Sequence, residues 1–310
     1  FCNVKKEAVI QSIDASTIYD VPNLMLEEGL DIVTLKKLGL SEKNIPNLKH
    51  WNEFIQKHKN PKHEVNIGLI GKYVELQDSY KSILESFIHA GATNETKVNV
   101  ISVHSEFLDD KSAHKQLKNL DGILVAPGFG SRGIEGKIDT VRYARENNIP
   151  FLGICLGMQM AVIEFARNVL GYDDANSTEM NEGTANPVIN LMEEQKNVVN
   201  KGGTMRLGAW KCSIKENTLA HKIYGTSEIS ERHRHRYEYN GKYLEELENA
   251  GLIASGVNPD TNLVEIVELK NHPFFIGVQY HPEYKSTVEN PHPLFVSFIK
   301  AVVAHKNNIN

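Results

Sequence analysis

Residues 150–159, Pro-Phe-Leu-Gly-Ile-Cys-Leu-Gly-Met-Gln, constrain the fold more than any other part of this chain. A short apolar run ends at Cys155, with Gly153 two residues before it and Gly157 two residues after it. This pattern is typical of a nucleophile elbow, in which a buried strand turns sharply into a helix and exposes the nucleophile, and glycine is needed where strand and helix pack closely. A helix expected from Gly157 to Arg167 directs its free N–H groups at the sulfur and favours a thiolate. The alternative, an ordinary core cysteine, leaves both glycines unexplained.

A second motif, His281-Pro282-Glu283, lies far downstream and supplies the groups that a nucleophilic thiol needs. Residues 273–278 read as a buried strand, so His281 is expected at a strand end, and the strand period of two places Glu283 on the same side. Pro282 fixes one backbone dihedral between them. Cys155, His281 and Glu283 therefore form a candidate nucleophile, base and orienting carboxylate. The alternatives are a partly exposed histidine and a solvated carboxylate without catalytic roles.

These motifs resemble those of the class I (triad) glutamine amidotransferases, which take ammonia from the side-chain amide of glutamine. Within that group the chain is similar to the CTP synthase family, from residue 1 to about residue 304. Composition and spacing alone lead only to a cysteine hydrolase of α/β type. Four segments carry the resemblance: Phe-Leu-Gly-Ile-Cys-Leu-Gly-Met-Gln at 151–159, Asn-Ser-Thr-Glu at 176–179, Gly-Gly-Thr-Met-Arg-Leu-Gly at 202–208 and Glu-Arg-His-Arg-His-Arg-Tyr-Glu at 231–238.

From residue 65 onward, strand-like and helix-like segments alternate, which predicts an α/β fold of the class I glutamine amidotransferase type. Such alternation favours a mostly parallel central sheet flanked by helices. Later strand-like segments are separated by turns and suggest a partly antiparallel extension. The expected early strands are 65–70, 97–103, 122–125 and 149–154, the helices 80–90, 112–117 and 137–145, and the later strands 208–214, 232–239, 252–257, 263–269 and 274–279.

The sequence predicts two parts, residues 1–60 and residues 61–310. In the first part we expect a short strand at 8–10 and helices within 18–40, too little for a core of its own. A charged linker with one short helix around 51–55 follows. The resemblance implies that residues 1–60 are the C-terminal end of an ATP-dependent synthetase (amidoligase) domain and the interdomain linker, and that 61–310 are the amidotransferase domain.

The chain starts at Phe1 without an initiator Met, so we interpret it as a fragment whose synthetase phosphate-binding loop lies upstream. The resemblance aligns Asp14 and Ala15 with a segment that contacts adenine. For Asp14 the alternative is a helix-cap carboxylate.

Composition bounds the function without deciding it. The 310 residues carry a net charge of −5 and the sequence pI is about 6.2, so no basic footprint for nucleic acid or an anionic membrane is present. Three cysteines are too few for a disulfide framework. A catalytic thiol requires a reducing compartment, so we expect a cytoplasmic protein. We found no apolar stretch of about 18 residues, no signal peptide and no metal-site motif.

The developing oxyanion of an acyl transfer needs hydrogen-bond donors. By analogy with the family, these are the backbone N–H of Leu156 and one in the glycine turn at 126–130. Ala-Pro-Gly-Phe-Gly stands there, where many relatives read Pro-Gly-Gly-Phe-Gly. Because Pro127 has no N–H, we predict that Gly128 is the second donor.

The run Glu-Arg-His-Arg-His-Arg at 231–236 admits a nucleic-acid patch or a metal site as well as a carboxylate-binding site. On a strand, its arginines share one face and its histidines the other, and guanidinium groups suit a carboxylate or phosphate. The resemblance assigns Arg236 to the α-carboxylate of glutamine and Glu179 to its α-ammonium. A structural ion-pair network is the alternative.

The first helical turn after the elbow contains Gly157, Met158 and Gln159. By the resemblance these residues line the pocket for the substrate amide, together with Gly128 and Leu156. For Met158 the alternative is ordinary core packing.

The resemblance implies glutamine hydrolysis without a cofactor, with Cys155 as nucleophile. In the whole enzyme, ammonia would pass to the synthetase domain and aminate UTP phosphorylated by ATP, giving CTP, with Mg²⁺ accompanying the ATP. GTP would activate the glutaminase half, with the glycine-rich stretch 201–206 as a lid near it, and the whole enzyme would be a homotetramer. The alternatives are the glutaminase of another class I amidotransferase, such as GMP synthetase, and a catalytically idle scaffold or filament module.

Overall fold

The computed structural model describes residues 3–43, 46–108, 115–191 and 205–309. The chain divides into two compact units, Phe1–Asn60 and Pro61–Asn310. This division falls at the residue where the sequence places the boundary. The origin of the first unit in a synthetase domain stays a prediction.

The first unit is helical, and its elements are η1 (Lys6–Ala8), η2 (Ile18–Asp20), α1 (Val21–Glu27), α2 (Leu30–Leu38) and α3 (Lys49–Lys59). The strand expected at 8–10 is wrong: Ala8 ends a 3-10 helix and the next two residues belong to no regular element. A strand needs a partner to bond its backbone, and the described part of this unit contains no strand. The helix expected at 51–55 is longer than predicted.

A small aromatic cluster holds α3 to η2 in the first unit. The rings of Tyr19 and Phe54 meet edge to face with centroids 4.8 Å apart. The indole Nε1 of Trp51 donates a hydrogen bond to the Tyr19 carbonyl at 2.8 Å. Lys59 pairs with Asp20 at 2.7 Å. The cluster fixes the C-terminal half of the unit around one buried tyrosine.

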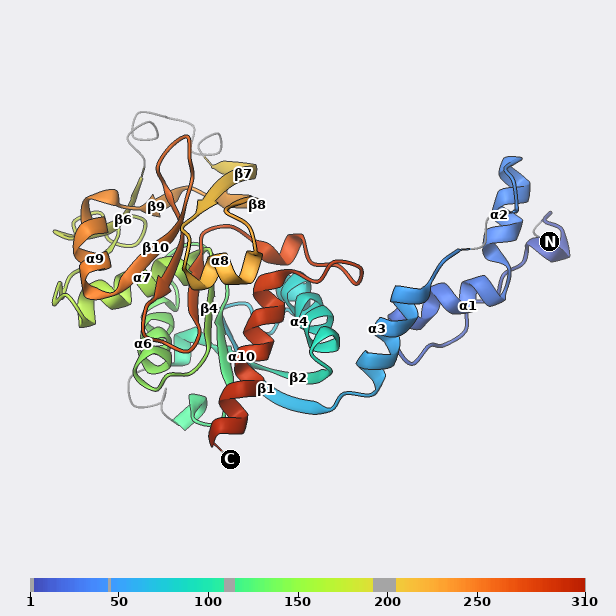
Figure 1. Ribbon diagram of the computed structural model, residues 1–310, viewed down its shortest axis with the longest axis horizontal. Helices are drawn as coiled ribbons and strands as arrows, with labels where there is room; N and C mark the ends of the chain where they lie inside the picture. Colours follow the sequence, from blue (N-terminus) through green and yellow to red (C-terminus); the bar gives the residue numbers. More distant parts are fainter. Residues whose placement is uncertain (1–2, 44–45, 109–114, 192–204, 310) are drawn as a thin grey trace. The chain divides into compact units, whose positions relative to one another are not determined.

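The second unit is built on a nine-stranded sheet in the order β2-β1-β3-β4-β12-β11-β10-β7-β8. Figure 1 labels the strands β1, β2, β4, β7, β8 and β10 of this sheet. Pairing is parallel from β2 to β12 and antiparallel from β12 to β8. Both the mostly parallel sheet and its antiparallel extension are therefore confirmed. The strands are β1 (His63–Gly71), β2 (Thr96–His104), β3 (Gly122–Val125), β4 (Phe151–Ile154), β7 (Arg206–Ile214), β8 (Glu228–His235), β10 (Leu252–Val257), β11 (Val264–Leu269) and β12 (Phe275–Val278).

A second, three-stranded sheet contains β5 (Asn176–Ser177), β6 (Pro187–Leu191) and β9 (Tyr237–Tyr239). The single strand expected at 232–239 is therefore wrong. β8 ends at His235, which pairs with Arg206 of β7, whereas Tyr237 of β9 pairs with Leu191 of β6. Arg236 lies where the chain passes from one sheet to the other.

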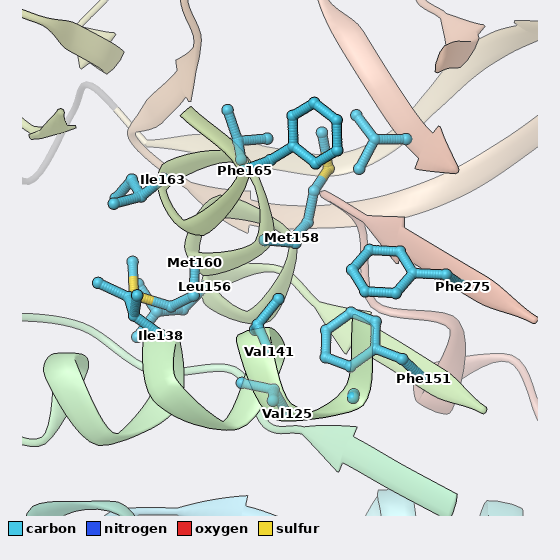
Figure 2. Close-up of a cluster of buried hydrophobic side chains, with 14 of the residues drawn as sticks. Val125, Ile138, Val141, Phe151, Leu156, Met158, Met160, Ile163, Phe165 and Phe275 are labelled. Carbon is cyan, nitrogen blue, oxygen red and sulfur yellow. The ribbon is translucent and has the colours of Figure 1, made fainter. Parts of the chain in front are cut away.

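Helices cover both faces of the large sheet. Neighbouring residues of a strand enter different cores: Ile123 belongs to the core that includes residues of α6, α7 and α9, and Leu124 to the core that includes residues of α4, α8 and α10. Figure 2 shows the first core, where Phe151 of β4 and Phe275 of β12 stack with ring centroids 4.3 Å apart. The helices are α4 (Lys81–Thr93), α6 (Ile134–Glu146), α7 (Leu156–Asn168), α8 (Leu219–Tyr224), α9 (Leu244–Ala250) and α10 (Pro293–Ile309), with 3-10 turns η3 (Gln77–Tyr80), η4 (Ser105–Phe107), η7 (Gly241–Tyr243) and η8 (Pro282–Tyr284).

Most of the helix predicted at 112–117 lies outside the described residues, and residues 115–117 are helical. Among the described residues, no helix combines the length and the apolar character needed to cross a bilayer.

Candidate active site

The turn from β4 into α7 has the geometry of a nucleophile elbow. Cys155 lies between the two elements with φ 54° and ψ −103°, a conformation that costs energy for any residue with a side chain. A Cβ added at Gly157 would lie 2.2 Å from the Val125 carbonyl oxygen of β3, and one at Gly153 would lie 2.7 Å from the carbonyl carbon of Gly157. Both glycines are therefore required by close packing, as predicted. The turn holds the sulfur at the N-terminus of α7.

His281 and Glu283 meet next to this turn, but not by the route that the sequence suggested. The imidazole Nδ1 of His281 lies 2.7 Å from Glu283 Oε1, and both side chains are buried. The pair is joined by the 3-10 turn η8, which starts at Pro282, and not by the period of two of a strand. Pro282 cannot continue a ladder but suits the first position of a helical turn, so the strand interpretation is corrected here.

The pKa of His281 reports its contact with the nucleophile. Burial lowers this pKa, but the negative charges of Cys155 and Glu283 and the hydrogen bonds to them outweigh burial and raise it to about 11. His281 is therefore an imidazolium at neutral pH. Its Nε2 atom is buried and has no hydrogen bond of standard geometry among the described residues. No other described group occupies Nε2, which leaves it for the sulfur or the leaving group.

A cavity of about 280 Å³ opens at Cys155. Cys155 shares it with Gly128, Gln159, Glu179 and Arg236, all of which the sequence analysis placed at the site. The other lining residues were not predicted as site residues from the sequence. The full lining is Gly128, Phe129, Cys155, Gln159, Glu179, Met205, His235, Arg236 and Tyr237.

The first turn of α7 divides its residues between core and cavity. Met158 is fully buried in the hydrophobic core (Figure 2), which contradicts its expected place in the amide pocket. Gly157 packs on Val125 and does not line the cavity, and the side chain of Leu156 is also in the core. Gln159 does line the cavity, because it follows Cys155 by four residues and so lies one turn further on the same helix face.

The glycine turn beside the cavity is held by two lysines that the sequence analysis missed. The buried Nζ of Lys137 donates a hydrogen bond to the Ala126 carbonyl at 2.6 Å, and Lys72 donates to the Phe129 carbonyl. Burial, followed by the charge of Lys72, lowers the pKa of Lys137 to about 7. The backbone N–H of Gly130 in the same turn donates to Glu179 at 2.8 Å. Gly128 lies between these anchored peptides; its role as oxyanion donor stays a prediction.

The Arg/His run is divided by the break between the sheets. Arg232 and Arg234 are exposed on β8, and Arg232 lies over the ring of Tyr284 at 5.5 Å from its centroid. Only Arg236, past the end of β8, lines the cavity. The expectation of three guanidinium groups on one face is therefore wrong, because the strand ends at His235.

His235 lines the cavity from the buried face of β8. Its Nδ1 lies 3.2 Å from the Tyr237 carbonyl, which can only accept a hydrogen bond. Burial, followed by the charges of His233 and Arg206, lowers the pKa of His235 well below its usual value, so the ring is neutral. The alternation of histidine and arginine was the signal for its burial, but nothing local indicated that it reaches the cavity.

The lid predicted near GTP can be compared with the structure only in part. Most of the lid predicted at 201–206 lies outside the described residues, and Arg206, its guanidinium, is buried against Glu265 at 2.6 Å and Glu238 at 3.6 Å. This ion-pair network contradicts a role for Arg206 in a mobile lid.

The residues predicted to contact adenine lie in the first unit, where Asp14 is exposed and Ala15 is half-buried. Thr17, not Asp14, caps η2. The described residues contain no cluster of side chains suited to hold a metal ion.

Comparison with known proteins finds relatives of the second unit and of nearly the whole chain. The family model of class I glutamine amidotransferases matches residues 75–301. Curated CTP synthases of Flavobacterium psychrophilum and Flavobacterium johnsoniae are 82% and 76% identical over 307 residues, which are 99% of this chain and 57% of each relative. The chain thus spans little more than half the length of these relatives.

Solved structures also match. The acivicin-bound glutaminase domain of Trypanosoma brucei CTPS is 41% identical, with a TM-score of 0.73, over 77% of this chain and 94% of that chain. A structure from Thermoplasma acidophilum, described as one subunit of a GMP synthase, is 18% identical with a TM-score of 0.51, over 79% of this chain and 97% of that chain, and shows the fold alone. The chain belongs to the class I glutamine amidotransferase family and, within it, to the CTP synthases.

Proposed function

We propose that the second unit hydrolyses glutamine to glutamate and ammonia through Cys155, His281 and Glu283. The observation that carries this proposal is the position of Cys155. It lies on a strained turn at a helix N-terminus, opens into the cavity, and interacts with a buried histidine that is hydrogen-bonded to a buried carboxylate. This combination has the nucleophile, base and orienting group of a triad.

Charges at the cavity suit an amino acid substrate. Arg236 is a cationic partner for the α-carboxylate, and Glu179 is an anionic partner for the α-ammonium. Because Glu179 already accepts from the N–H of Gly130, substrate binding at Glu179 is linked to the glycine turn that contains Gly128. Glu179 therefore both binds the substrate and holds the turn beside the reacting carbon.

In the proposed reaction, the Cys155 thiolate attacks the side-chain amide carbon, and the N–H groups of Gly128 and Leu156 stabilise the oxyanion. Imidazolium His281 gives its proton to the leaving ammonia, and a thioester forms. Neutral His281 then removes a proton from water, which attacks the thioester and releases glutamate. Glu283 keeps the imidazole ring oriented through both steps.

We further propose that the ammonia serves CTP formation in a longer enzyme. Membership of the CTP synthases and the 57% coverage of their length support an upstream synthetase domain. That domain would use ATP, with Mg²⁺, to activate UTP for amination, with Asp14 and Ala15 near the adenine, GTP as activator and a homotetramer as the assembly. The described residues 3–43 and 46–60 of the first unit would be its C-terminal end, and a free catalytic thiol suits the cytoplasm.

The test is steady-state ammonia release from glutamine by the chain and by a Cys155→Ala variant. The variant should lose activity by roughly 10³-fold or more. Cys212→Ala is the matched control, because Cys212 is also buried in the same hydrophobic core but lies in β7 and does not line the cavity, and its rate should stay close to that of the unmodified chain. Turnover by Cys155→Ala near the unmodified rate contradicts the proposal.

Two further outcomes separate the alternatives. Ammonia release that is absent even when the complete protein is tested with ATP, UTP and GTP would favour an idle scaffold. A complete protein that releases ammonia but forms no CTP from UTP and ATP would favour a different synthase.

A further inference from the structure

Two buried glutamines connect the wall of the cavity to the nucleophilic sulfur. Gln159 lies on α7, and Gln279 lies directly after β12, two residues before His281. The Gln159 Nε2 atom is 3.1 Å from the Tyr237 carbonyl oxygen and 3.1 Å from Gln279 Oε1. The Gln279 Nε2 atom is 3.6 Å from the sulfur of Cys155. The proposed reaction uses Gln159 only as cavity lining and Gln279 not at all.

The direction of this chain of hydrogen bonds is fixed by its first member. The Tyr237 carbonyl can only accept, so the amide nitrogen of Gln159 must face it. The same nitrogen also donates to Gln279, so the atom of Gln279 that accepts this hydrogen bond must be its side-chain oxygen. The NH₂ group of Gln279 is thereby turned towards Cys155, and a thiolate can only accept. Each carboxamide thus has one orientation that satisfies all its neighbours.

We propose that Gln279 is a positioning residue, which donates a hydrogen bond to the sulfur of Cys155 and is itself oriented by Gln159. This inference rests on the proposed glutaminase function and adds to it a second donor for the nucleophile beside His281. Gln279 is fully buried, and its backbone N–H donates to the Glu265 carbonyl at 2.9 Å. A rigid segment therefore carries both groups that face the sulfur, Gln279 and His281.

A hydrogen-bond donor beside the sulfur of Cys155 would stabilise its negative charge. Charged sulfur in a water-poor site needs hydrogen bonds to replace those of solvent, and the imidazolium of His281 must leave the sulfur to protonate the departing ammonia. An amide N–H that stays on the sulfur holds its direction of attack while the proton moves. During release of glutamate the same N–H stabilises the sulfur as it regains its charge.

The experiment measures the rate of alkylation of Cys155 by iodoacetamide against pH, with peptide mass spectrometry to separate the cysteines. The variant Gln279→Met keeps the size of the side chain and removes the donor. The pH midpoint of Cys155 alkylation should move upward by about one unit, the shift expected for loss of one hydrogen bond to a charged group. Gln279→Glu keeps the acceptor for Gln159 but places an oxygen at the sulfur, so its midpoint should move further.

Kinetics supply the second readout. In Gln279→Met the kcat for glutamine hydrolysis should fall roughly tenfold, with little change in KM, because the sulfur and not the substrate loses a contact. Asn258→Leu is the matched control: Asn258 is another fully buried carboxamide, bonded to the Lys211 carbonyl at 2.8 Å outside the site. It should leave the alkylation profile unchanged even if it lowers stability.

A folded Gln279→Met protein with the alkylation midpoint of the unmodified chain overturns the inference. If neither Gln279 variant folds, the unmodified chain decides by NMR. The side-chain amide protons of Gln279 should then shift downfield as Cys155 ionises, and resonances that do not respond overturn the proposal. Alkylation needs no glutamine, so the two proposals can fail separately. An upward midpoint, together with no ammonia release by the complete protein, would refute the proposed function and keep the hydrogen bond.

Discussion

The contact between Gly157 and β3 permits a sharp test of how the elbow is built. In Gly157→Ala, the added Cβ would lie 2.2 Å from the Val125 carbonyl oxygen and 3.1 Å from its carbonyl carbon. Contacts of real Cβ atoms essentially never fall below 3.0 Å, so α7 and β3 must separate by about 0.8 Å. Neither partner can yield easily, because the clash is with backbone in the centre of the sheet and not with a flexible side chain.

The magnitude follows from overpacking. A forced shift of this kind costs about 1–3 kcal/mol of unfolding free energy, and a unit of this size loses about 2–4 °C in Tm per kcal/mol. We therefore expect a fall in Tm of about 5 °C. The same displacement moves Cys155 relative to His281, and a misplacement of about 1 Å can lower turnover by on the order of 10²-fold.

The assay is thermal unfolding by circular dichroism, paired with ammonia release from glutamine. Gly241→Ala is the matched control, since a Cβ at Gly241 would have no atom within 4 Å and its φ lies outside the left-handed region. The control should keep both its Tm and its activity. A Gly157→Ala protein that melts within 1 °C of the unmodified chain, as the control should, would refute the packing argument.

Two other predictions concern buried charges. The pKa of His281 is raised from 6.5 to about 11, so its stabilising contribution is complete below pH 6.5 and is lost as the pH rises towards 11, because only the folded state still holds the proton in this window. In Cys155→Ala, which removes the charge that raises this pKa most, urea unfolding across that window should depend less on pH; an unchanged pH dependence would argue against the ion pair. Arg206→Leu leaves Glu265 buried without its guanidinium partner at 2.6 Å and should cost about 3–5 kcal/mol in urea unfolding. Lys211→Leu, on the exposed face of the same strand, should cost less than about 0.5 kcal/mol, and equal losses in the two variants would contradict the assignment.

Features governed by near neighbours in the sequence were predictable. The glycines on either side of Cys155 indicated a strand that turns into a helix, because close packing excludes side chains at those two positions. Alternation of apolar runs predicted the parallel sheet, since each strand of a parallel pair needs a covering crossover element. The break between β8 and β9 was not visible, because the residues of both strands have the same local preference and only their partners differ.

In the candidate site, too, contacts between residues distant in the sequence could not be predicted. The sequence named Cys155 and Gln159, but periodicity did not show that Met158 turns into the core while its neighbour faces the cavity. Lys137 was missed because its partner is a backbone carbonyl, which has no signature in sequence.

What the sequence determined by itself was the strained turn that carries the nucleophile, because steric exclusion acts between residues a few positions apart. What only the tertiary structure decided was the surroundings of the sulfur. Gln279 reaches Cys155 across 124 residues and Gln159 across 120. Hydrogen bonds of this range depend on how strands and helices pack, and no local pattern encodes that packing.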